Sequence, residues 1–118
     1  MKKEIINSII LVVKKKGAQL IKSKAKNAVS PMSYSLKGSK KSYTPDIVAK
    51  YETRQDFFAV EGRFKTKDVP DLITKWILFA SSARNTGGKL YLVVKKNGAA
   101  KFERIIAEKS ISAHLIII

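Results

Sequence analysis

The sequence contains no cysteine and a single histidine, His114. The lack of cysteine excludes disulfides, thiolate metal sites and a cysteine nucleophile. The lone histidine excludes a zinc site with several histidines from one chain, and in a terminal strand it is expected to be structural. The opening stretch MKKEIINSIILVVKKKG has too few apolar residues to span a bilayer, and no small-residue cleavage site follows it. We therefore expect an amphipathic helix in a cytoplasmic protein that has no membrane contact.

Acidic residues are scarce. The 118 residues include 9 Asp and Glu against 24 Lys and Arg, for a formal net charge of +15. The imbalance is steepest in residues 1–45, which hold eleven lysines and one acid, Glu4. A positive field of this size attracts polyanions, and nucleic acid is the commonest of these. The alternatives are an acidic protein partner, an anionic membrane surface, or a lysine-rich composition that serves only solubility.

The hydrophobic pattern predicts an α/β fold in a single domain over residues 1–118. Helical spacing over residues 3–16 ends at Gly17, and a short strand follows over residues 18–22. Residues 23–44 are rich in serine and lysine and predict a long loop or irregular hairpin. The order continues with a strand hairpin, a helix started by Asp68, a strand at residues 89–94, a helix capped by Asn97 and a final strand. This order, α-β-β-β-α-β-α-β, predicts a mixed sheet of about five strands with helices on both faces.

Two predictions concern which side chains share a face. Alternation in the second hairpin strand places five residues on one face: Phe57, Ala59, Glu61, Arg63 and Lys65. The helix after Asp68 is expected to bury seven apolar residues: Leu72, Ile73, Trp76, Ile77, Phe79, Ala80 and Ala83.

Two carboxylates, Asp46 and Glu61, fall on the predicted hairpin strands. Carboxylates on adjacent strands can hold Mg²⁺, with water and phosphate filling the remaining octahedral positions. A cation two residues after Glu61 would face the same side, where it could orient water and stabilise the transition state of phosphodiester hydrolysis. The simpler alternatives are that Asp46 follows Pro45 as a turn signal and that Glu61 pairs with Arg63 or Lys65.

The element order, Pro45-Asp46 and the Glu61-Gly62-Arg63 stretch together resemble the PD-(D/E)XK nuclease superfamily, which has a restriction-endonuclease-like fold. The stretch WILFASSARNTGGKLYLVV is similar to the helix and strand of archaeal-type Holliday junction resolvases. The resemblance implies a Mg²⁺ site, with Mn²⁺ as substitute, formed by Asp46, Glu61 and the carbonyl of Gly62. It also implies that an acid of the first helix, here Glu4, assists.

The family's lysine is replaced by Arg63, which stays protonated and is a poorer participant in proton transfer. Lys65, one pleat further on, or Lys75, in the following helix, could supply the ammonium instead.

The leading hypothesis is a Mg²⁺-dependent DNA endonuclease of resolvase-like type, in the cytoplasm, the nucleoid or the interior of a host cell. The rivals are a non-catalytic nucleic-acid-binding protein and a basic adaptor for an acidic protein. A homodimer would suit so small a domain, because one copy can approach only one strand at a time. Six side chains are predicted to contact nucleic acid: Lys37, Lys40, Lys41, Tyr34, Tyr43 and Lys75.

Overall fold

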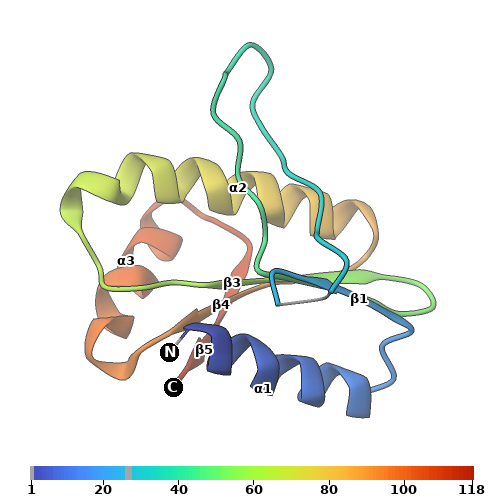
Figure 1. The fold of residues 1–118 in the computed structure, drawn as a ribbon. Coiled ribbons are helices and arrows are strands. Elements are labelled where there is room, and N and C mark those ends of the chain that lie inside the picture. The colour runs from blue at the N-terminus through green and yellow to red at the C-terminus, as the bar shows by residue number, and fades with distance from the viewer. Residues whose placement is uncertain (1, 26–27) are drawn as a thin grey trace.

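Five strands form one mixed sheet in the computed structural model, which describes residues 2–25 and 28–118 (Figure 1). The helices are α1 (Lys2–Lys15), α2 (Val69–Asn85) and α3 (Ala99–Glu108). The strands are β1 (Leu20–Ser23), β2 (Ile47–Lys50), β3 (Gln55–Val60), β4 (Leu90–Val94) and β5 (Ala113–Ile117). Short 3₁₀ turns at Thr66–Asp68 and Lys96–Gly98 precede α2 and α3. The predicted α/β fold and its element order are confirmed.

The strands lie in the sheet in chain order, β1-β2-β3-β4-β5. The first three are antiparallel neighbours, with Ile47 opposite Phe58, whereas β3, β4 and β5 run parallel. The change of direction follows from the connections. A short turn joins β2 to β3, whereas α2 and α3 form the crossovers that parallel neighbours require.

Helices cover both faces of the sheet, as Figure 1 shows, with α1 on one face and α2 and α3 on the other. The alternation of β3 divides its side chains between these layers. Phe57 and Ala59 pack in the core under α2 and α3, while Phe58 and Val60 pack in the core under α1. None of the helices in the described part of the chain is both long and apolar enough to cross a membrane.

Helix α2 buries a narrower stripe than its sequence predicts. Four residues at positions i, i+3, i+4 and i+7 are buried: Trp76, Phe79, Ala80 and Ala83. Leu72 and Ile73 are partly buried, and Ile77 is 48% exposed, so its predicted burial is wrong. Ile77 follows Trp76 by about 100° around the helix, which turns it away from the sheet. Asn97 lies inside the 3₁₀ turn and does not cap α3, which begins after Gly98.

Strand β3 ends at Val60, earlier than predicted. The backbone N–H of Glu61 still donates to the carbonyl of Val93 at 2.9 Å, but the chain then leaves the sheet. Phe64 turns onto α3, where its ring meets the ring of Phe102 edge-on at 5.3 Å. Packing of the Phe64 ring against α3 favours a chain path that leaves the sheet after Glu61. Arg63 and Lys65 therefore do not form a strand face with Glu61, and that prediction is wrong.

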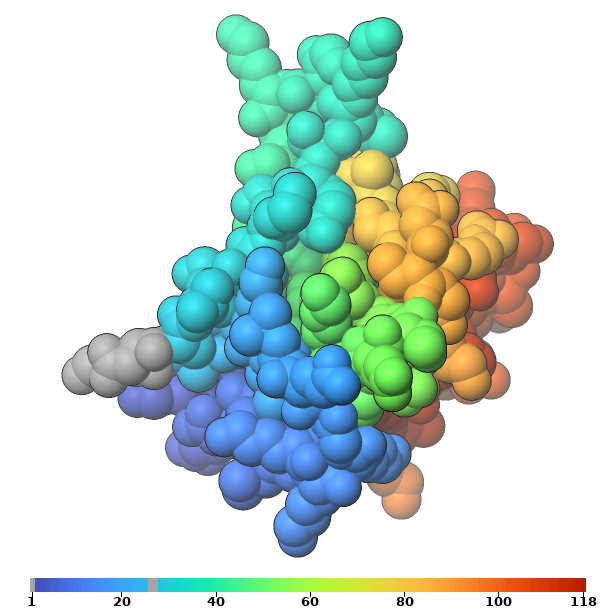
Figure 2. Space-filling model, turned by 90° about the vertical axis from the view of Figure 1, so that its right-hand side faces the viewer, coloured from blue at the N-terminus to red at the C-terminus, as the bar shows by residue number. Residues whose placement is uncertain are grey.

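Residues 34–43, which we call the arm, project beyond the rest of the molecule as an irregular hairpin (Figures 1 and 2). Tyr34 and Tyr43 close its base through two backbone hydrogen bonds of 2.7 and 2.8 Å, and Gly38 near its tip has φ +85°. The ring of Tyr34 packs against Phe57 at 5.7 Å and Phe79 at 6.1 Å. Tyr34 is thus partly buried against the core, and its predicted role in base stacking stays a prediction.

Candidate functional site

Asp46 directly precedes β2, and its side chain bridges to the last residue of β3. Its Oδ2 accepts a 2.6 Å hydrogen bond from the backbone N–H of Val60, and Asp46 is only 4% exposed. A strand N–H lies close to the sheet plane, so the carboxylate sits at the end of the sheet instead of on one face. Asp46 is therefore bound to Val60, the residue that precedes Glu61 in the chain.

The second oxygen of Asp46 has charge partners but no hydrogen bond. Its Oδ1 lies 3.0 Å from Nζ of Lys2 in α1 and 3.4 Å from Nζ of Lys24. Neither ammonium is aligned for a hydrogen bond, so this buried oxygen lacks a hydrogen-bond donor among the described residues. A buried carboxylate oxygen with lone pairs to spare is an acceptor ready for a cation or a water.

Glu61 is held by two consecutive residues of α2. Nζ of Lys75 lies 2.9 Å from Oε1 and 2.7 Å from Oε2, and the indole Nε1–H of Trp76 donates to Oε2 at 2.9 Å. The Glu61 side chain is 6% exposed and Trp76 is fully buried. The predicted core position of Trp76 is confirmed, but its bond to Glu61 was not foreseen. The available signal was that a buried indole N–H needs an acceptor.

Among the cations proposed for Glu61, the structure selects Lys75. Neither Arg63 nor Lys65 forms an ion pair with a carboxylate in the described ranges, so the suggested pairing of either residue with Glu61 is wrong. Both instead line a cavity of about 290 Å³, which Glu61 and Asp68 also line. The ammonium that contacts Glu61 therefore comes from helix α2 and not from the residues that follow β3.

Glu4 does not join the site. It is exposed on α1, and no described contact brings its carboxylate to Asp46 or Glu61. The phase of the helix explains this. Lys2 and the buried Ile6 are one turn apart and share the face toward the sheet, whereas Glu4 lies about 200° from each. The first helix does reach Asp46, but with Lys2, and the predicted role of Glu4 stays a prediction.

The two carboxylates fit a magnesium ion in the kind of donors they offer. Two carboxylates and the Gly62 carbonyl would leave coordination positions of the ion for water and phosphate. Oδ1 of Asp46, which accepts no hydrogen bond from the described residues, is available as a ligand. Their present partners come from different layers, with Lys2 of α1 near Asp46 and Lys75 of α2 on Glu61. In residues 2–25 and 28–118, no three His, Asp or Glu side chains form a cluster. A shared ion stays a prediction.

The base of the arm is fixed to the first turn of α2 through Asp71. Its carboxylate pairs with Nζ of Lys41 and accepts a 3.0 Å hydrogen bond from the hydroxyl of Tyr43. These bonds lower the pKa of Asp71 and raise that of Lys41, and burial with the same carboxylate raises the pKa of Tyr43. Lys41 and Tyr43 therefore position the arm. Lys37 and Lys40 are exposed, and their contact with nucleic acid stays a prediction.

Comparison with known proteins finds no family model, no curated protein and no solved structure that matches this chain.

Proposed function

We propose that the protein is a divalent-metal-dependent endonuclease that hydrolyses phosphodiester bonds in DNA, with a restriction-endonuclease-like core of the PD-(D/E)XK kind. The observation that carries the proposal is the pair Asp46 and Glu61. These two buried carboxylates stand at the ends of adjacent strands in a protein with few acids, and an ammonium lies 2.7 Å from the second. Burying two carboxylates costs free energy unless each has a charged partner, and a bound metal ion would be such a partner.

The side chains have separate roles in this proposal. Asp46, Glu61 and the Gly62 carbonyl would hold Mg²⁺ or Mn²⁺, which supplies charge neutralisation at phosphate and an acidified water when bound. The Lys75 ammonium, which contacts Glu61, would orient a water there by donating a hydrogen bond to it. Arg63, which lines the cavity of about 290 Å³ together with Glu61, would stabilise negative charge that develops on the phosphate oxygens.

The net charge of +15 supports a nucleic-acid substrate. The exposed lysines of the arm, Lys37 and Lys40, would contact phosphates beyond the cleavage site, and a branched DNA would offer strands on both sides of the arm. A homodimer would bring a second carboxylate pair to the opposite strand.

A non-catalytic nucleic-acid-binding protein is the second candidate, and one observation favours it. Lys75 and Trp76 already donate to Glu61, and Lys2 and Lys24 stand beside Asp46. In that case the lysines neutralise the carboxylates permanently, and the acids only organise the basic surface.

A cleavage assay separates the two candidates. Duplex, branched and single-stranded DNA are each incubated with Mg²⁺ or Mn²⁺ and the wild type, Glu61→Gln or Lys75→Met. We expect wild-type cleavage, complete loss in Glu61→Gln with DNA binding retained, and a loss of roughly 10²–10⁴-fold in Lys75→Met. The control is Glu103→Gln, which removes the same charge from an exposed position on α3.

Two results would contradict the endonuclease proposal. Cleavage that survives Glu61→Gln would place the activity elsewhere. Binding without cleavage of any of the three substrates would leave the non-catalytic candidate.

A further inference from the structure

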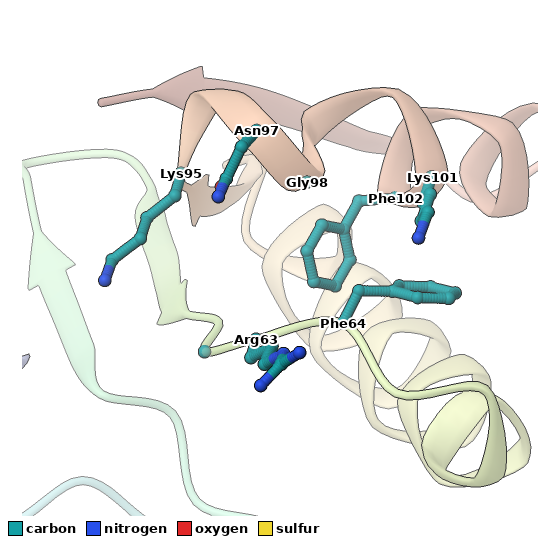
Figure 3. Close-up of a pocket in the computed structure, with 8 residues that line it drawn as sticks. Arg63, Phe64, Lys95, Asn97, Gly98, Lys101 and Phe102 are labelled. Atoms are coloured by element: carbon teal, nitrogen blue, oxygen red, sulfur yellow. The ribbon is translucent and has the colours of Figure 1, made fainter.

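A second cavity, of about 380 Å³, lies beyond the ends of β3 and β4. Three segments contribute cations to its lining: Arg63 follows β3, Lys95 follows β4 directly, and Lys101 lies near the start of α3. Figure 3 shows Asn97 and Lys101 extending from the α3 side toward the segment that carries Arg63, Lys95 extending to one side, and the Arg63 side chain lying beyond its own backbone. Ligands of open α/β sheets bind in this place, outside the carboxyl ends of parallel strands.

The lining carries positive charge without compensation. No acidic residue lines the cavity. In the part of the chain that the structure describes, none of the three cations forms an ion pair with a carboxylate. Lys101 does have a cation–π contact, because its Nζ lies 5.6 Å from the centre of the Phe64 ring. The three cations are exposed, but they line one hollow with no carboxylate in its lining, which favours an anion there.

We propose that this cavity binds a phosphomonoester, the dianionic phosphate at the end of a nucleic-acid strand or on a free nucleotide. Three cations suit the charge of −2 better than the single charge of a phosphodiester. Asn97 adds an amide donor, and the volume lies in the range of small-molecule sites. Binding of a nucleic-acid strand end rests on the proposed function. Arg63 and Gly62 also line the cavity that contains Glu61, so the bound end would lie near that residue.

The test measures binding without cleavage, in EDTA and at fixed ionic strength. The probe is a short single-stranded DNA, labelled at its 3′ end, with either a 5′-phosphate or a 5′-hydroxyl. We expect the 5′-phosphate to tighten binding about tenfold, the usual size of a hydrogen bond to a charged group. Lys95→Gln and Lys101→Gln should each remove most of this difference. Lys109→Gln, an equal charge change at the other end of α3, should preserve it.

Two free ligands distinguish the source of the phosphate. Deoxythymidine monophosphate and inorganic phosphate are titrated into ¹⁵N-labelled protein, and the amide signals of Gly98 and Lys101 are followed. Equal binding of the two oligonucleotides, together with saturable shifts by the mononucleotide, would assign the cavity to free phosphomonoesters. Equal binding of the two oligonucleotides with no such shifts would overturn the proposal. Because EDTA prevents metal-dependent cleavage, either outcome is independent of whether the protein is a nuclease.

Discussion

The ion pair between Lys75 and Glu61 makes a quantitative prediction about stability. Lys75→Met keeps the length of the side chain and removes its ammonium. The Glu61 carboxylate, with a side chain 6% exposed, would keep the hydrogen bond from Trp76 as its one side-chain partner among the described residues. Removing one partner of a buried pair costs about 3–5 kcal/mol. Since the Lys75 side chain is 22% exposed and water can partly replace it, we expect a loss of about 2–3 kcal/mol in the free energy of unfolding.

Trp76 provides the assay, because it is the only tryptophan and its indole touches Glu61. Urea unfolding is followed by its fluorescence, and the midpoint for Lys75→Met should fall by about 1–2 M. The double variant Glu61→Gln, Lys75→Met should regain part of this loss, because no unpaired charge then stays buried. Lys109→Met, at an exposed position, serves as the control.

The same variant tests whether Lys75 competes with a metal ion for Glu61. Mn²⁺ at about 100 times its dissociation constant would add about 2.7 kcal/mol of stability. This stabilisation should appear at lower Mn²⁺ concentration in Lys75→Met than in the wild type, and should be absent in Glu61→Gln. A loss below about 0.5 kcal/mol for Lys75→Met, the range of ordinary surface changes, would refute the view that the ammonium compensates a buried charge.

Two further predictions concern the sheet and the arm. Gly88→Ala would place a Cβ 1.8 Å from the carbonyl oxygen of Gln55, so urea unfolding should show a loss of about 2–4 kcal/mol, whereas Gly98→Ala has its nearest contact at 3.6 Å and should be tolerated. Because the folded pKa of Asp71 is lowered, its anchoring of the arm is fully present above the ordinary value of 3.8 and is lost as the pH falls through the lowered value. The Tyr43 ring signals should therefore shift on acidification in the wild type, and an unchanged transition in Asp71→Asn would contradict this assignment.

The sequence alone determined the order of the elements and the meeting of Asp46 with the end of β3. Helical and strand periods are local properties, so α1, α2, β4 and β5 were predictable within a few residues. The closeness of Asp46 to the residue before Glu61 also follows from local information. A short turn joins β2 to β3, and antiparallel pairing then fixes which residues face each other.

Only the tertiary structure decided which cations accompany the carboxylates. The rotation of α2 against the sheet places Lys75 and Trp76 on Glu61, and the phase of α1 brings Lys2 to Asp46 in place of Glu4. These rotations depend on how whole layers of side chains pack, which no short stretch encodes.

The same reason applies to the two features farthest from any motif. Tyr34 reads as a loop residue, yet its ring fills space between Phe57 and Phe79, which lie more than twenty residues away. The cationic cavity combines Arg63, Lys95 and Lys101 from three separate segments. Their convergence exists only after β3 and β4 pair in parallel and α3 folds back over their ends.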